Sequence, residues 1–151
     1  MGNKYVDDPA ISDDEILWRR VHHKNIVIDD NQGRVRPSSA AFSDSSNGSP
    51  MSALRAKVVN ETARRPEDVL VANHPYLASM RVQMLRAREL GIDPRRHMGH
   101  EDPAHVYVFG NKTKSTKAAI AENAEWVIGP SDELLLKRFG PKAIPYLSKS
   151  A

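Results

Sequence analysis

The sequence predicts an α+β (or small α/β) fold: a single domain with a small mixed sheet, a few helices and a C-terminal strand–helix–strand unit. Short β-branched or aromatic runs at 26–28 and 105–109 are typical of strands, and turn-forming residues separate them from their neighbours. Apolar residues spaced by three and four along 77–90 are typical of a helix. A chain of 151 residues is long enough for one domain with its own core.

The beginning of the chain is acidic, with five carboxylates and one lysine in residues 1–15. We expect a flexible acidic arm over residues 1–12 and a single globular domain over residues 13–151. Ser12 and Glu15 have the spacing of a capping box, which favours a short helical turn that leads into a strand. The apolar residues that follow fit a strand equally well.

The next segment combines a turn with a long polar stretch. Residues 26–28, the turn sequence DDNQG and residues 34–36 predict a hairpin or two short segments joined by a loop. The stretch after them is rich in Ser, Pro, Asn and Gly, as exposed loops are. It also contains two alanines and Phe42, which a slack linker would not need. We therefore expect order through Phe42 and an exposed loop around 43–50.

The middle of the chain leaves two alternatives open. Residues 51–59 alternate loosely and fit a strand or a helix. Pro66, with acidic residues after it, suits the first turn of a helix. Residues 77–90 predict a helix that Gly91 caps, and the alternative is a strand over 77–81 followed by a shorter helix.

The clearest unit lies near the C-terminus. Residues 105–109 and 125–128 read as strands, and a helix capped by Ser115 or Thr116 joins them. The order strand, helix, strand is close to the minimum length for a parallel crossover. Ser131 then begins a last helix, which a Gly-Pro pair ends.

Bulk composition narrows the class of protein. The formal net charge is only +3, and aromatic residues make up 6% of the chain, which argues against nucleic acid as a partner. No apolar run is long enough to span a bilayer and the first residues do not form a secretory signal, so we expect no membrane association. The absence of cysteine fits a reducing compartment, and we expect a cytoplasmic protein.

Two segments offer groups that bind anions. The loop FGNKTKST at 109–116 connects a strand to a helix start, where free N–H groups, Lys112 and Lys114 would attract negative charge. The loop lacks the glycine spacing of a Walker A motif. Arg36 can bind phosphate or carboxylate through two parallel hydrogen bonds from its planar guanidinium, and Ser38 and Ser39 add hydroxyl groups.

Histidines are the candidates for proton transfer, because imidazole titrates near neutral pH. His22 and His105 each adjoin an expected strand and are the candidate acid/base residues. His97 and His100 lie in a polar loop whose spacing does not predict a structural zinc site, so we expect no metal.

These features favour a small protein with a polar pocket for an anion, a nucleotide or another phosphate compound. The predicted ligand-binding residues are Arg19, Arg36, Ser38, Ser39, His105, Lys112 and Lys114. The sequence identifies no pair of nucleophile and base, so enzyme status stays open. The alternative is a protein-binding component of a bacterial toxin–immunity or defence pair, with the acidic arm and the 43–50 loop as contact surfaces.

Two resemblances accompany this interpretation. The arginines and serines of residues 17–42 resemble the core strands of ADP-ribosyltransferase-like NAD-consuming folds, which implies a late catalytic glutamate, for which Glu125 is the only acid beside a late strand. The pattern LWRR…RPSSAAF…GSPMS…GNKTKS resembles a group of small uncharacterised bacterial proteins. That second resemblance covers most of the chain and implies no activity.

Overall fold

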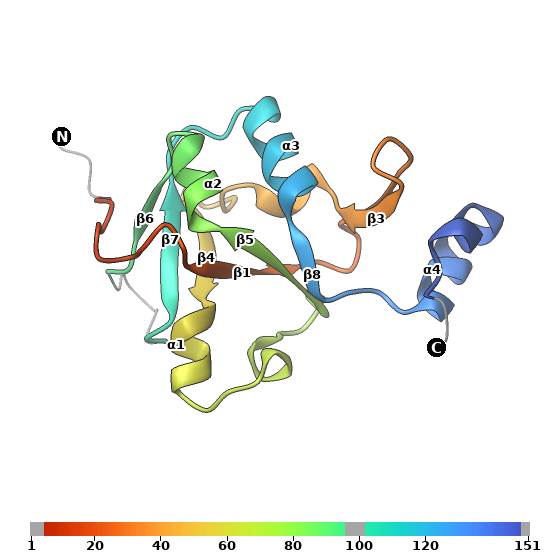
Figure 1. Cartoon of the computed structure of the whole chain (residues 1–151), viewed down its shortest axis with the longest axis horizontal. Coiled ribbons are helices and arrows are strands. Elements are labelled where there is room, and N and C mark those ends of the chain that lie inside the picture. The colour runs from red at the N-terminus through yellow and green to blue at the C-terminus, as the bar shows by residue number, and fades with distance from the viewer. Residues whose placement is uncertain (1–4, 96–101, 149–151) are drawn as a thin grey trace.

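The computed structural model describes residues 5–95 and 102–148, and these form an α+β domain built on one sheet (Figure 1). The sheet has six strands in the order β6-β7-β4-β1-β5-β8, and every neighbouring pair is antiparallel. The strands are β1 (Ile16–Val21), β4 (Met51–Arg55), β5 (Tyr76–Arg81), β6 (Gly91–Asp93), β7 (His105–Phe109) and β8 (Glu125–Ile128). A separate hairpin joins β2 (Ile26–Asp29) to β3 (Arg34–Pro37).

Short helices cover both faces of the sheet. The α-helices are α1 (Ala56–Glu61), α2 (Val82–Ala87), α3 (Lys114–Asn123) and α4 (Asp132–Phe139), and the 3₁₀ turns are η1 (Ser39–Phe42), η2 (Pro66–Val69) and η3 (Gly140–Tyr146). Buried residues of α2, α3 and η1 pack with Leu17 and Val21 of β1 on one face. Those of α1 and η2 pack with Trp18 on the other. β1 therefore separates two cores, as alternation along a strand requires.

Several expected elements are confirmed. The hairpin at 26–37, the strands at 105–109 and 125–128, and the last helix after Ser131 all form. Residues 51–59 combine both alternatives, because β4 runs directly into α1. The segment 39–42 is ordered as η1, and the ring of Phe42 is fully buried.

The helix expected over 77–90 is wrong, and the alternative of a strand followed by a shorter helix is right. β5 pairs with β1 at six positions, from Tyr76 to Arg81, and with β8 on its other side. Leu77 and Met80 are buried in different cores. Because both faces of β5 are covered, its apolar residues do not alternate, and their spacing imitates a helix.

The Ser12–Glu15 segment forms the expected turn, in which the Glu15 amide donates to the Ser12 carbonyl over 3.0 Å, and the chain then enters β1. The expected start of the next-to-last helix differs from the structure. α3 begins at Lys114, because Thr113 is its cap and its hydroxyl accepts the Thr116 amide at 3.1 Å. β7 and β8, which flank α3, are separated in the sheet by β4, β1 and β5.

The N-terminal segment lies against β6 and α2. Within residues 5–12, Ile11 is buried, and the Asp8 amide donates to the carbonyl of Ile92 over 2.9 Å. Arg86 of α2 donates to the Ile11 carbonyl at 2.7 Å and to the Asp8 carbonyl at 2.9 Å. Residues 1–4 of the expected arm lie outside the described residues.

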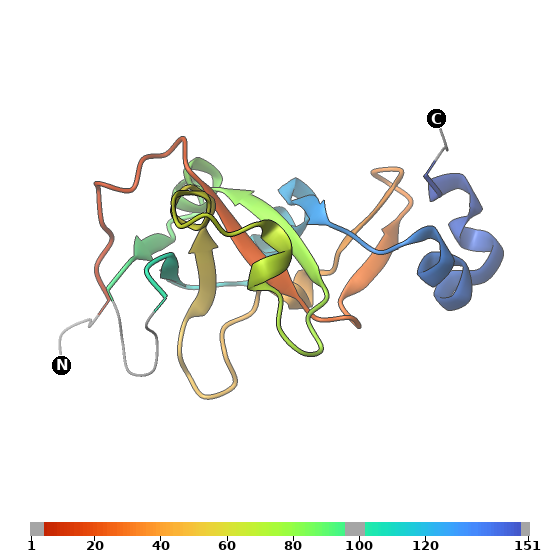
Figure 2. The same ribbon diagram turned by 90° about the horizontal axis from the view of Figure 1, so that it is seen from below.

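The C-terminal helices lie beside the hairpin, at one end of the molecule (Figure 2). The hydroxyl of Tyr146 donates to Asp30 over 2.8 Å, and Arg138 donates to the carbonyl of His23 over 2.6 Å. In residues 5–95 and 102–148, no helix has the length and apolar character to cross a membrane.

Ser131 stabilises the start of α4 by capping it. Its hydroxyl accepts the Leu134 amide at 3.2 Å. We expect Ser131→Ala to lower the free energy of unfolding by about 1 kcal/mol, the usual effect of losing a side-chain cap. Urea denaturation measures this, with Ser115→Ala in the first turn of α3 as the control. Equal losses in both variants would contradict a capping role for Ser131.

Candidate functional site

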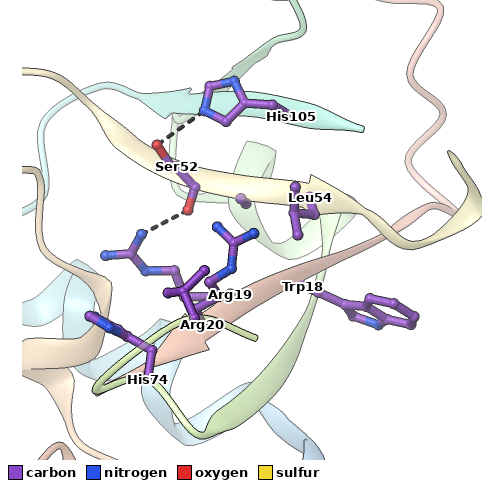
Figure 3. A pocket seen from close by; sticks show the side chains of 9 residues that line it. Trp18, Arg19, Arg20, Ser52, Leu54, His74 and His105 are labelled. Atoms are coloured by element: carbon purple, nitrogen blue, oxygen red, sulfur yellow. Dashed lines mark hydrogen bonds between the residues drawn. The ribbon is translucent and has the colours of Figure 1, made fainter. Parts of the chain in front are cut away.

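A pocket of about 220 Å³ opens where β1 and β4 diverge (Figure 3). These two strands pair only at Leu17–Arg55 and Trp18–Leu54. Continued pairing would bring Arg20 opposite Ser52, but no such pair forms. The residues that line the opening are Trp18, Arg19, Arg20, Ser52, Ala53, Leu54, Val71, His74 and His105. The pocket is thus a gap between β1 and β4, and the β1 edge of this gap contributes Arg19 and Arg20.

Arg19 is fixed by carbonyl groups alone. Its Nε donates to Ala41 at 2.9 Å, its Nη1 to Ser52 at 2.8 Å and its Nη2 to Ser43 at 3.4 Å. The pKa of Arg19 is lowered to about 10, chiefly by burial and also by the positive charge of Arg20, and the negative charge of Asp44 opposes this shift. The guanidinium therefore stays charged at neutral pH in a poorly hydrated place.

Arg20 uses only part of its hydrogen-bond donor capacity within the described chain. Its Nε donates to the carbonyl of Val69, and no residue in the described ranges accepts a hydrogen bond from its two Nη groups. Burial lowers the pKa of Arg20, while the negative charge of Asp102 raises it. The Asp102 carboxylate is itself engaged by both Nη groups of Arg64, at 2.7 and 2.9 Å. Arg20 consequently keeps hydrogen-bond capacity at the pocket.

The other half-buried arginines of the described chain differ from this pair, because each lies within ion-pair distance of a carboxylate. The pairs are Arg34 with Glu125, Arg36 with Asp29, Arg55 with Glu15, Arg64 with Asp102, and Arg86 with Asp7 and Asp13. Among the described residues, the hydrogen-bond acceptors of Arg19 and Arg20 are all carbonyl oxygens. In the described part of the chain, the pocket therefore holds two guanidinium charges that no bonded carboxylate neutralises.

Ser52 and His105 form a hydrogen-bonded pair at the same pocket. The Nε2 of His105 is 3.1 Å from the Oγ of Ser52. Ser52 on β4 pairs with Tyr107 on β7, so His105, two residues from Tyr107, points to the same face of the sheet. Only 4% of His105 is exposed, and its ring packs edge-on against Tyr107 with centroids 4.6 Å apart. The strand pairing thus fixes the position of both groups.

His74 lines the pocket and belongs to a cluster of three imidazoles. Its ring centroid is 5.1 Å from that of His22, which stacks on His23 at 4.3 Å. The pKa of His22 is lowered, chiefly by partial desolvation. The neighbouring charges of His23, His74 and Lys24 act in the same direction. His22, a predicted acid/base residue, is therefore next to the pocket lining and not part of it.

The structure brings only two predicted ligand-binding residues, Arg19 and His105, into this pocket. Arg36 lies on the hairpin and donates to Asp29 at 2.7 Å and to Pro37 at 2.8 Å. The ammonium of Lys112 is 2.6 Å from Asp44, and its side chain is only 3% exposed. Two of the four cations that were expected to bind a ligand, Arg36 and Lys112, are therefore neutralised by carboxylates.

The remaining predicted residues are also elsewhere. Ser38 precedes η1 and makes no capping bond, and Ser39 begins η1. Lys114 is exposed at the first position of α3. Glu125, which the ADP-ribosyltransferase resemblance requires, lies on the edge strand β8 with its side chain 75% exposed and does not line this pocket.

Sequence reasoning missed Arg20, Ser52 and His74. Arg20 follows Arg19 in the chain, but only the divergence of β1 from β4 gives it a place in the pocket. Ser52 carries no local signal, since its link to His105 spans 53 positions. Only the register of β4 and β7 brings the two together.

Within residues 5–95 and 102–148, no three His, Cys, Asp or Glu side chains are arranged to hold a metal ion. His97 and His100 lie outside the described residues. Comparisons with protein-family models, with curated proteins and with solved structures give no match.

Proposed function

We propose that the pocket between β1 and β4 binds a small anion, namely a phosphate group, either free or at the end of a larger compound. The observation that carries this proposal is the pair of guanidinium groups, Arg19 and Arg20, that share the pocket without a bonded carboxylate in the described chain. Arginine offers five N–H donors in a planar fork, which matches the oxygens of phosphate. A dianion would offset both half-buried charges.

The size of the pocket narrows the ligand class. Sites that enclose drug-sized molecules usually measure about 300–1,000 Å³, and this pocket measures about 220 Å³. A phosphate group fits such a volume, and the remainder of a nucleotide would extend outside it. We therefore propose recognition of the phosphate group and assign no role to a base or sugar.

Calorimetric titration with inorganic phosphate tests the proposal. We expect Arg20→Gln to raise the Kd about 10- to 100-fold, because a hydrogen bond to a charged group contributes about 1.5–3 kcal/mol. Arg88→Gln is the matched control, since it removes the same charge from an exposed position after α2. It should leave the Kd unchanged.

Two outcomes would contradict the proposal. The first is a wild-type protein that binds neither phosphate nor pyrophosphate at millimolar concentration. The second is an equal loss of affinity in Arg20→Gln and Arg88→Gln, which would indicate general attraction to a basic protein and not recognition in the pocket.

A further inference from the structure

The proposed phosphate site contains a serine and a histidine in the geometry of a nucleophile and its base. The Oγ of Ser52 and the Nε2 of His105 are 3.1 Å apart, within the range in which imidazole can take a hydroxyl proton. Both residues line the pocket that holds Arg19 and Arg20 (Figure 3). A nucleophile–base pair and an anion-binding group are thus present in one cavity.

Contacts on several sides hold the pair within hydrogen-bond distance, which favours proton transfer. The two residues lie on adjacent strands with a fixed antiparallel register. The Nη1 of Arg19 donates to the carbonyl of Ser52 at 2.8 Å and so anchors the backbone of the nucleophile. Tyr107 packs against the imidazole ring. Positioned groups of this kind lower a reaction barrier without reorganisation during the reaction.

We propose that this pair hydrolyses a phosphate monoester. Ser52 is the nucleophile that accepts the phosphoryl group and passes it to water, and His105 is the base. This inference rests on the proposed function, because the substrate enters as the phosphate group that Arg19 and Arg20 bind. Arg20 supplies the hydrogen bonds to the non-bridging oxygens as charge develops on them.

The chemistry balances in two steps. In the first, a bond forms between the Oγ of Ser52 and phosphorus while the ester P–O bond breaks. The serine proton moves to the Nε2 of His105 and from there to the leaving oxygen, which departs as an alcohol. In the second, a water oxygen attacks phosphorus, the Ser52–phosphorus bond breaks, and the water proton returns through His105 to Ser52. The products are an alcohol and inorganic phosphate.

A covalent probe tests the nucleophile separately from anion binding. Diisopropyl fluorophosphate is uncharged and phosphorylates activated serines with loss of fluoride, so it does not need the arginines. We expect peptide mass spectrometry to locate one adduct at Ser52, and inorganic phosphate to slow its formation. Ser79 is an internal control, because it is a half-buried strand residue whose Oγ faces a carbonyl, that of Glu125 at 3.4 Å, and no imidazole.

The variants identify the base. Ser52→Ala should abolish the adduct, and His105→Gln should slow its formation about 100-fold or more. His105 is buried, so circular dichroism must show that the variant folds. If it does not fold, the comparison of Ser52 with Ser79 in the wild-type protein still tests whether Ser52 is an activated nucleophile.

The outcomes separate the two proposals. Phosphate binding without an adduct at Ser52, or equal modification of Ser52 and Ser79, would overturn the nucleophile and leave the anion pocket intact. An adduct at Ser52 in a protein that binds no phosphate would support an activated serine and overturn the proposed function. Release of p-nitrophenol from p-nitrophenyl phosphate by the wild type, and not by Ser52→Ala, would support both.

Discussion

Replacing Phe42 with alanine is expected to lower the free energy of unfolding by about 3–5 kcal/mol, as truncation of a buried aromatic residue does. The Phe42 side chain has no exposed surface and belongs to the core that α3 and β1 share. Its loss would leave a cavity that the short η1 turn cannot close by itself. The measurement is urea denaturation followed by tryptophan fluorescence.

The same substitution should reach the pocket. Phe42 lies between Ala41 and Ser43, whose carbonyls accept hydrogen bonds from Arg19. A shift of this segment would free the guanidinium of Arg19 from its fixed place. We therefore expect Phe42→Ala to weaken phosphate binding as well as to lower stability.

Phe139→Ala is the control for the removal of an aromatic ring. Phe139 is half-buried at the end of α4, so its truncation should destabilise the protein by less than that of Phe42. A loss below about 1 kcal/mol for Phe42→Ala would contradict the packing described for η1. The slope of the urea transition must stay unchanged for the comparison to hold.

Local signals account for the elements that could be predicted. The hairpin at 26–37 follows from β-branched residues around a turn sequence, and both lie within a few positions of one another. The burial of Phe42 follows from an aromatic residue that a slack loop would not need. By contrast, the prediction of a helix over residues 77–90 was wrong because β5 is buried on both faces. That burial depends on segments distant in sequence.

The site depended on distant contacts even more strongly. Arg36 and Lys112 looked like free cations, but Asp29 and Asp44 neutralise them across 7 and 68 positions. No local feature of the sequence distinguishes Arg20, and it lines a pocket only because β1 and β4 stop pairing after Trp18 and Leu54. A single sequence shows which charged residues exist, and only the fold shows which of them lack a partner.

Glu15→Gln is expected to lower the free energy of unfolding at pH 7 by about 3 kcal/mol. Glu15 accepts two hydrogen bonds from Arg55, at 2.8 and 2.7 Å, and its side chain is only 9% exposed. Removal of one partner from a buried pair costs about 3–5 kcal/mol. The Arg55 side chain remains 20% exposed and can regain some water, which places the loss at the lower end.

The pH dependence of stability identifies the source of this loss. Hydrogen bonding to Arg55 lowers the pKa of Glu15 in the folded protein. The pair therefore contributes its full stability above the unfolded pKa, about 4.3, and loses it as the pH falls through the lower folded value. Urea titrations between pH 7 and pH 3 should show a smaller acid loss in Glu15→Gln than in wild type.

The exposed Glu122 supplies the control, because Glu122→Gln removes the same charge from α3 and should reproduce the wild-type pH profile. Glu15→Leu, Arg55→Leu and their combination complete a double-mutant cycle. If the pair acts as a unit, the double variant should be more stable than the sum of the single losses predicts, since neither partner is then left buried alone. Strictly additive losses would mean that Glu15 stabilises the turn before β1 through its bond to the Ser12 amide and not through Arg55. An unchanged acid profile in Glu15→Gln would contradict any contribution from the Glu15 charge.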